Sequence, residues 1–283
     1  MTHSPQRRTR RLLVFCAGVV PALVAAATSG LAGAANAAAL PDHKPTITKR
    51  GQAYMGWSTR HSAQTAASGA TPFATTTVRG MDVSSWQGNV AWQTAYNNGA
   101  RFAYVKATES TNYTNPYFSQ QYNGSYNVGM IRGSYHFATP NTSSGATQAN
   151  YFLAHGGGWS RDGKTLPGAL DIEYNPYGAT CYGLSQASMR SWIASFINQY
   201  HARTGRWAPI YSTTDWWTRC TGNYSGFAAN NPLWVARYAS SAGTLPAGWS
   251  FYTFWQYADS GTFPGDQDVF NGAYARLQVL ATG

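Results

Sequence analysis

Two carboxylic acids interrupt an apolar run near the middle of this chain. Asp171 and Glu173 lie in segment 168–174 (GALDIEY), which otherwise has the composition of a buried strand. Because side chains alternate faces along a strand, both acids point to one face, and Leu170 and Ile172 point to the other. Two carboxyl groups this close repel, so one tends to keep its proton near neutral pH while the other stays ionised. A proton donor beside a carboxylate is the pair of groups that cleaves a glycosidic bond. A structural role, in a salt bridge to arginine or as a helix N-cap, is the alternative.

Strand-like and helix-like patterns alternate on either side of this pair and define the elements that must position it. The clearest helix begins after Ser185, a typical N-cap, and ends at Gly205, since apolar residues between them recur at the spacing of one buried face. Weaker helices are expected at 90–98, 116–127, 146–155 and 213–219, and strands at 79–84, 101–108, 130–137, 166–173, 208–212, 233–238, 252–257 and near 268–270. This alternation predicts one α/β domain, and eight strands favour a closed TIM-like barrel over an open, flavodoxin-like sheet.

Other acids map to the same end of such a barrel, where the chemistry of these folds lies. Asp82 ends the first expected strand, and Asp268 lies near the last, which is beside the first if the sheet closes. Glu109 is a weaker candidate, and Asp266 could be a turn residue. Four of the ten carboxylates are therefore expected on one rim: Asp82, Asp171, Glu173 and Asp268.

Aromatic residues follow the same ends of the strands. Flat rings stack on the apolar faces of sugars, although for any single aromatic residue ordinary core packing is the better interpretation. His136 could be a base or a hydrogen-bonded core histidine. The aromatic residues at or just past strand ends are Trp86, Tyr135, Phe137, Tyr174, Tyr211, Trp234, Trp255 and Tyr257.

The first 37 residues have the features of an export signal. Four arginines precede an apolar stretch from Leu12 to Ala27, and Ala35-Asn36-Ala37 has the form of a signal peptidase site, so cleavage is expected after Ala37. A membrane anchor is the alternative, but Pro21 lies in the stretch and no stop-transfer charges follow it. Residues 38–77 are rich in Ala, Thr, Ser and Gly and are interpreted as a flexible linker or pro-segment. The folded domain is expected over 78–283.

Charge and cysteine content limit the partners. The formal net charge is +10, and loss of four arginines with the signal would leave +6, which favours binding to an anionic polymer such as a bacterial wall. Nucleic acid is disfavoured because the folded part has no run of basic residues. Two cysteines remain after the signal, so an exported protein is expected to form one disulfide, Cys181–Cys220, rather than keep two buried thiols.

Several kinds of chemistry lack their sequence signatures. No glycine-rich phosphate loop, nucleophile elbow or zinc-binding spacing is present. We therefore expect no metal and no cofactor.

The order of eight short motifs resembles the glycoside hydrolase family 25 lysozymes, the CH-type muramidases, and is closest in appearance to secreted actinobacterial members. The motifs are 80–87 (GMDVSSWQ), 102–109 (FAYVKATE), 132–137 (RGSYHF), 170–173 (LDIE), 210–212 (IYS), 233–238 (LWVARY), 255–257 (WQY) and 266–271 (DQDVFN). The resemblance spans about 78–283.

The resemblance implies a flattened barrel of eight strands with about five helices and a long groove at its rim. It implies hydrolysis of the β-1,4 bond between N-acetylmuramic acid and N-acetylglucosamine in peptidoglycan, in some members also with 6-O-acetylated muramic acid. By position Glu173 matches the proton donor and Asp171 the partner that steers the substrate's acetamido group, while Asp82 and Asp268 match further rim carboxylates. The residues expected to bind the glycan are Trp86, Tyr135, Phe137, Tyr174, Tyr211, Trp234, Arg237, Trp255 and Gln256.

The nucleophile and three rival functions stay open at this point. Either a carboxylate attacks, or the substrate's own N-acetyl oxygen attacks with retention of configuration, and the family favours the second route. A wall-binding lectin would need the aromatic residues but not Glu173. An amidase or peptidase would need a metal or a Cys-His pair, and a chitinase-like enzyme would also use paired acids. The protein is expected to act outside the cell as a monomer on peptidoglycan strands, without a membrane anchor once the signal is removed.

Overall fold

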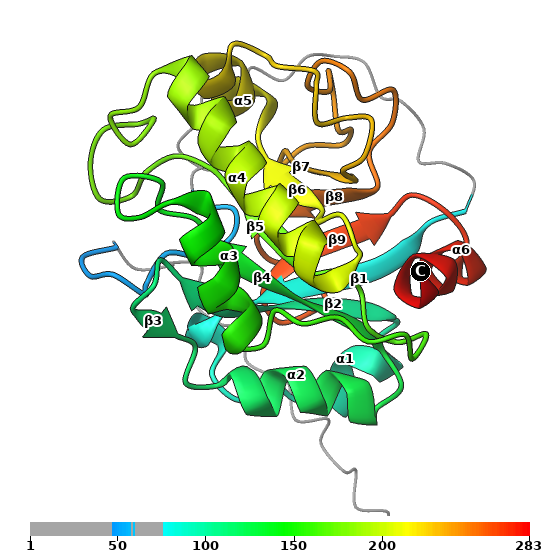
Figure 1. Cartoon of the computed structure of the whole chain (residues 1–283). Coiled ribbons are helices and arrows are strands. Elements are labelled where there is room, and N and C mark those ends of the chain that lie inside the picture. The colour runs from blue at the N-terminus through cyan, green and yellow to red at the C-terminus, as the bar shows by residue number, and fades with distance from the viewer. Residues whose placement is uncertain (1–46, 58, 60–75) are drawn as a thin grey trace, which may run out of the picture. The chain divides into compact units, whose positions relative to one another are not determined.

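Eight strands close into a barrel in the computed structural model, which describes residues 47–57, 59 and 76–283 (Figure 1). The hydrogen-bonded order is β1-β9-β8-β7-β6-β5-β4-β2, and pairing of β1 with β2 closes the circle. This confirms the single α/β barrel domain and excludes the open sheet. The strands are β1 (Val78–Val83), β2 (Phe102–Glu109), β4 (Ile131–Phe137), β5 (Ala169–Asp171), β6 (Ile210–Ser212), β7 (Leu233–Ala236), β8 (Phe254–Ala258) and β9 (Asp266–Phe270).

The last strand, β9, runs against both of its neighbours, whereas the other barrel strands are parallel. Its register sets Asp266 opposite Asp82 and Asp268 opposite Gly80. A ninth strand, β3 (Tyr113–Thr114), pairs with the end of β2 outside the barrel. Two residues are too few to show strand periodicity, which explains why the sequence did not predict it.

Six α-helices accompany the strands, one more than expected. Helix α4 agrees with its prediction, since Ser185 accepts a hydrogen bond from the amide of Ser188 (3.1 Å) and Gly205 ends the helix at φ +70°. The extra helix, α6, follows β9. The helices are α1 (Trp92–Asn97), α2 (Phe118–Asn127), α3 (Gly145–Ala154), α4 (Gln186–Thr204), α5 (Thr214–Thr221) and α6 (Tyr274–Thr282), with a short 3₁₀ turn at Ser85–Gln87.

Alternation along the strands separates two apolar layers. The barrel interior is filled by rings such as Tyr104 and Trp234, whose centroids lie 4.6 Å apart. Leu170 and Ile172 instead pack in the layer between the sheet and helices α3 and α4. Asp171 lies between them in sequence, so its side chain points to the interior, as the period of two predicts.

One disulfide joins the loop after β5 to α5. Cys181 and Cys220 have their Cα atoms 5.4 Å apart and are 39 residues apart in sequence. The expected disulfide is thereby confirmed.

Upstream of the barrel, residues 47–57 pack beside β3 and β4 (blue in Figure 1). They belong to the segment interpreted from sequence as a flexible linker or pro-segment. Residues 47–57 are packed against the barrel, so the expectation of a flexible linker does not hold for them. The role of residues 38–77 stays a prediction. The expected signal, 1–37, lies outside the described residues.

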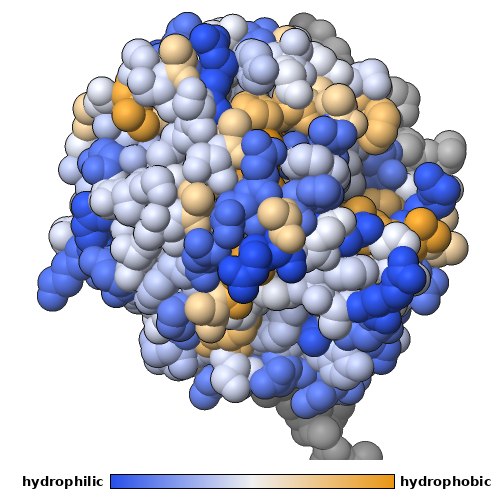
Figure 2. All heavy atoms as spheres, in the orientation of Figure 1, coloured by the Kyte–Doolittle hydropathy of each residue, from blue (hydrophilic) through white to orange (hydrophobic). Residues whose placement is uncertain are grey.

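The surface of the described residues is mixed in polarity. Figure 2 shows mostly hydrophilic and neutral residues on one face, with apolar residues in scattered areas. None of the described helices is long and apolar enough to cross a membrane.

Candidate active site

Asp171 and Glu173 meet at the carboxyl end of β5, inside the barrel. Asp171 is the last residue of the strand, Glu173 follows two residues later, and both side chains are fully buried. Neither oxygen of Asp171 accepts a hydrogen bond from the described residues. Burial raises the pKa of Asp171 well above its ordinary value, and the charges of Glu173 and Asp82 add to the effect, while Lys106 opposes it. The pair therefore favours holding a proton near neutral pH.

Gln256 connects the acids of β1 and β9. Its Nε2 donates to Oδ2 of Asp82 (2.7 Å) and to Oδ2 of Asp266 (3.2 Å). Its Oε1 accepts from the hydroxyl groups of Tyr211 (2.7 Å) and Tyr238 (3.2 Å). One amide group thus holds two carboxyl groups and two phenols in fixed positions.

Asp268 lies deeper, beside the same acids. Nε1 of Trp234 donates to its Oδ1 (3.0 Å). Burial raises the pKa of Asp268 well above its ordinary value, and the charges of Asp82 and Asp266 raise it further. Five carboxyl groups therefore share the interior near the rim: Asp82, Asp171, Glu173, Asp266 and Asp268.

Lys106 is the buried cation of this region. It lies on β2 with no exposed surface, and its Nζ is 2.7 Å from Oε2 of Glu109. Its charge lowers the pKa of Asp171 against the dominant effect of burial. The weaker rim candidate Glu109 therefore has an ion-pair partner within the barrel.

His136 is a core residue. Its Nδ1 lies 2.8 Å from Oγ1 of Thr108 and its Nε2 lies 2.9 Å from Oε1 of Gln148. Burial lowers its pKa to about 4. Because the amide oxygen can only accept, Nε2 donates to Gln148 and Nδ1 accepts from Thr108, so the ring is neutral and both nitrogens are satisfied.

The family model for "Glycosyl hydrolases family 25" matches residues 81–266, which include four of these five carboxyl groups and end two residues before Asp268. The chain belongs to glycosyl hydrolase family 25. It is 48% identical to Lysozyme M1 of Streptomyces globisporus over 97% of this chain and 96% of that protein. It is 51% identical to the N,O-diacetylmuramidase of a Chalaropsis species, over 73% of this chain and all of the relative. The structure of a muramidase from Acremonium alcalophilum, 60% identical, superposes with a TM-score of 0.72 over 73% of this chain and 99% of that one. The enzyme class expected from sequence, a glycoside hydrolase of the lysozyme type, is confirmed.

Five of the residues that the sequence assigned to glycan binding lie near the carboxyl groups of this family 25 domain, and a sixth, Trp86, lies against the upstream segment 47–57. Tyr135 is buried, and the charges of Asp82 and Asp171 help burial to raise its pKa. Trp86 and Phe137 flank residues 52–54. The five residues near the acids are Tyr135, Phe137, Tyr211, Trp234 and Gln256.

Three other assigned residues point elsewhere. Trp255 alternates with Phe254 and Gln256, so it packs in the layer under the helices, and its Nε1 donates to the carbonyl of Arg237 (2.9 Å). Arg237 itself donates to the carbonyl of Ser241 (2.9 Å). The hydroxyl of Tyr174 donates to Asp215 on α5. The structure does not bring these three side chains to the acids, and their assignment to glycan binding stays a prediction.

Sequence reasoning missed Asp266, Lys106 and Tyr238 as members of the cluster. Asp266 and Asp268 are spaced two apart, the same alternation that identified Asp171 and Glu173, so this signal was present. Lys106 lies in a fully buried strand, where a charge is as unusual as an acid. Tyr238 follows the end of β7 and carried no signal apart from its type.

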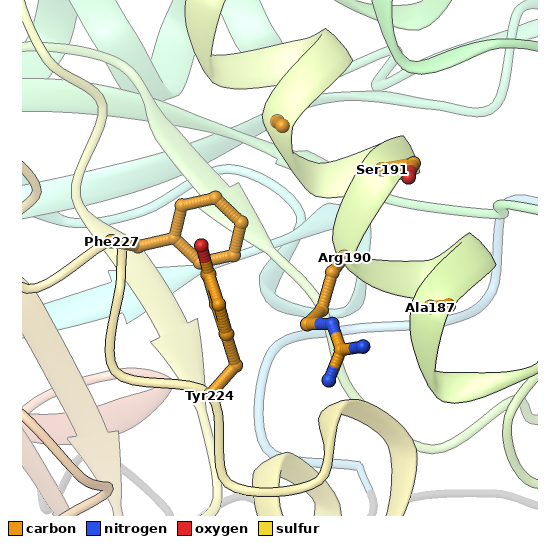
Figure 3. Close-up of a pocket in the computed structure, with 6 residues that line it drawn as sticks. Ala187, Arg190, Ser191, Tyr224 and Phe227 are labelled. Atoms are coloured by element: carbon orange, nitrogen blue, oxygen red, sulfur yellow. The ribbon is translucent and has the colours of Figure 1, made fainter.

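A surface pocket also lies on the far side of the sheet from these acids, on the outer face of α4 (Figure 3). Arg190 of the helix extends toward Tyr224 and Phe227 of the loop after α5, and Ala187, Ser191 and Ala194 complete the lining. It contains no carboxyl group, so it cannot supply the acid chemistry. Among the described residues, no three His, Cys, Asp or Glu side chains are grouped as metal ligands would be.

Proposed function

We propose that this protein is an exported muramidase that hydrolyses the β-1,4 bond between N-acetylmuramic acid and N-acetylglucosamine in peptidoglycan. The observation that carries the proposal is the buried pair Asp171 and Glu173 at the end of β5, inside the family 25 match. The names of the relatives, lysozyme and N,O-diacetylmuramidase, support the same substrate. The chain is proposed to lose residues 1–37 on export and to work as a monomer without cofactor, nucleic acid or membrane.

In the proposed mechanism Glu173 is the acid. It donates its proton to the glycosidic oxygen as the bond to the anomeric carbon breaks. The oxygen of the substrate's own acetamido group attacks that carbon, and Asp171 orients this group and balances its developing positive charge. Water then opens the cyclic intermediate while Glu173 takes back a proton. Two displacements at one carbon leave its configuration retained.

Asp82 and Asp268 act on this pair through charge. Asp82 lies within electrostatic range of both Asp171 and Asp268, since its charge raises the pKa of each, and Asp268 is linked to the pair through Asp82. A cluster of acids in a buried site favours the protonated form of at least one member. We propose that this keeps a proton available in the Asp171–Glu173 pair at the pH of the wall.

Muramic acid carrying a 6-O-acetyl group is proposed as a further substrate. A relative of 51% identity is named N,O-diacetylmuramidase, and the match extends over its whole length. The test is digestion of peptidoglycan with and without O-acetylation by the same preparation. Failure to release acetylated fragments would contradict this part of the proposal.

Mass spectrometry of digested peptidoglycan tests the main proposal. A muramidase leaves N-acetylmuramic acid at the new reducing end, and retention leaves it first as the β-anomer. New reducing ends on N-acetylglucosamine, or free stem peptides, would instead indicate a glucosaminidase or an amidase. Cleavage of plain N-acetylglucosamine polymers would indicate a chitinase, and binding without any release would indicate a lectin.

A further inference from the structure

Residues 47–57 lie directly over the acids that the proposed mechanism uses. The amide of Gly56 donates to Oε1 of Glu173 (2.9 Å), although 117 residues separate the two in sequence. The carbonyl of Gly56 accepts from the hydroxyl of Tyr238 (3.3 Å). One residue of the upstream segment thus contacts the proposed proton donor and a second side chain of the cluster.

The preceding residue continues this contact into the barrel. The amide of Met55 donates to the hydroxyl oxygen of Tyr135 (3.4 Å), and its carbonyl accepts from Nε2 of Gln256 (3.4 Å). The side chain of Met55 is fully buried among the rings of the barrel interior. Residues 55–56 therefore fill the mouth of the barrel with their backbone and with the side chain of Met55.

A second set of contacts fixes the beginning of the segment. Nζ of Lys106 donates to the carbonyls of Gly51 (3.2 Å) and Ala53. The amide of Gly51 donates to Oε1 of Glu109 (2.9 Å), and that of Ala53 to the hydroxyl of Tyr177 (3.4 Å). The buried Lys106–Glu109 ion pair thus holds backbone groups of this segment.

Two residues assigned to glycan binding are covered as well. Ile47, Ala53 and Tyr54 form an apolar cluster with Phe137. Trp86 donates from Nε1 to the carbonyl of Gln52 (2.7 Å), and its ring packs edge-on to Tyr54 with centroids 6.5 Å apart. The segment therefore occupies the surface on which a sugar ring would stack.

Glu173 and Asp171 have no exposed surface in this arrangement. A general acid must lie within hydrogen-bond reach of the oxygen that it protonates, so a glycan strand cannot react while the segment is in place. We propose that residues 47–57 are a built-in inhibitor that occupies the glycan site and keeps the enzyme latent. This inference rests on the proposed muramidase activity.

The chemistry of the segment fits that role. Its peptide groups offer the same N–H donor and carbonyl acceptor as the acetamido groups of peptidoglycan sugars, so both can use the same partners. The amide of Gly56 donates to Oε1 of Glu173 (2.9 Å), the carboxyl group that would have to reach the glycosidic oxygen. The segment thus blocks access to Glu173.

Cleavage of the chain between residues 60 and 75 is the proposed release step. While the chain is intact, the segment is held at high effective concentration, and a cut makes its binding bimolecular and therefore reversible by dilution. The Chalaropsis relative is matched over its whole length by 73% of this chain, and the family match begins at residue 81. That muramidase therefore has no counterpart of most of the upstream region, in agreement with a barrel that works without it.

The experiment uses the exported full chain with residues 63–68 replaced by the recognition sequence of a specific protease. Solubilisation of purified peptidoglycan is followed before and after the cut, at a dilution that lets the released peptide dissociate. We expect the rate to rise at least tenfold on cutting. A synthetic peptide of residues 47–57 added to the cut enzyme should lower the rate again, competitively with substrate.

Variants of the uncut chain test the contacts themselves. Gly56 has φ +87°, and an added Cβ would collide with the hydroxyl of Tyr238 and the amide oxygen of Gln256, so Gly56→Ala should raise the rate without a cut. Met55→Glu should do the same, because it places a charge among apolar rings and beside the acids. Lys49→Glu introduces the same side chain at an exposed position of the segment and should leave the uncut chain latent.

Two results would overturn the inference. If the uncut and cut chains solubilise peptidoglycan at the same rate, residues 47–57 do not inhibit, while the muramidase proposal stands. If neither form releases fragments, the muramidase proposal fails and the inference fails with it.

Discussion

Burial shifts the pKa values of the acids and of the histidine of the barrel in opposite directions. The pKa values of Asp171 and Asp268 are raised, so folding favours their protonated forms, and the stability they contribute is lost as the pH rises through those values. The pKa of His136 is lowered from 6.5 to about 4, so folding favours its neutral form. Its contribution is present above pH 6.5 and is lost as the pH falls toward 4.

At the scale of single residues, His136 gives a prediction that depends on pH. The fall of this pKa from 6.5 to about 4 corresponds to about 3 kcal/mol of unfolding free energy. His136→Gln should be less stable than the parent at pH 7, and this gap should shrink by about that amount between pH 6.5 and 4. Calorimetric melting at several pH values measures the gap. His155→Gln, at an exposed helix end, is the control, and a gap independent of pH for His136→Gln would contradict the assignment.

Glu173 supplies the catalytic prediction. Glu173→Gln keeps the shape of the side chain but cannot donate a proton, so the rate of reducing-end release should fall by about 10²–10⁴-fold. Asp171→Asn should keep the fold and lose most activity. Each variant is compared with the parent in the same uncut or cut form. Asp162→Asn, an exposed acid outside the cluster, should stay active, and clearing of walls by Glu173→Gln at the parental rate would end the assignment.

At the scale of secondary-structure elements, the long connection between β5 and β6 is held in place by helix packing and by a disulfide. Helix α4 packs its apolar face on the sheet, and the disulfide ties the start of the loop to α5. Glu173 lies at the beginning of this loop, one residue past the last backbone hydrogen bond to β6, which runs from the amide of Ile172 to the carbonyl of Tyr211 (3.1 Å). The position of the proposed acid therefore depends on the end of the sheet on one side and on the loop on the other.

Removal of the disulfide should test this tie. A bridge that closes a loop of 39 residues stabilises by about 4 kcal/mol in the chain-entropy model. Cys181→Ala combined with Cys220→Ala should lower the melting temperature by about 8 °C or more, measured by calorimetry. Activity at 25 °C should persist, because both sulfur atoms lie outside the acid cluster. An unchanged melting temperature would contradict a stabilising role.

At the scale of the whole molecule, folding separates charges by sign. The chain has only ten acids, and six of them are buried in the barrel: Asp82, Glu109, Asp171, Glu173, Asp266 and Asp268. Among the described lysine and arginine residues, only Lys106 and Arg237 are buried. The surface that meets an anionic wall is therefore more positive than the net charge of +6 expected after loss of the signal suggests.

This separation predicts salt-dependent action on walls. Raising NaCl from about 0.1 M to 1 M shortens the Debye length from about 10 Å to about 3 Å, so long-range attraction to the polymer is screened. The rate on intact walls should fall on the order of tenfold, and the rate on short neutral glycan fragments should change much less. Equal salt profiles for the two substrates would show that surface charge does not load the enzyme onto walls.

Local pattern was enough to identify the barrel, the helix between Ser185 and Gly205 and the buried pair Asp171 and Glu173. These features can be predicted from neighbouring residues, because side-chain alternation, helix capping and apolar spacing each involve residues only a few positions apart in sequence. The order of the motifs added the enzyme family.

Tertiary structure alone decided what faces those acids. Asp266 joins the cluster only because an antiparallel strand closes the sheet beside β1, and Trp255 leaves it because its neighbours take the inner face. The contact between Gly56 and Glu173 spans 117 residues, and local patterns carry no information about a pairing at that separation. Sequence therefore determined which chemistry the barrel contains, and long-range packing determined that its own upstream segment covers that chemistry.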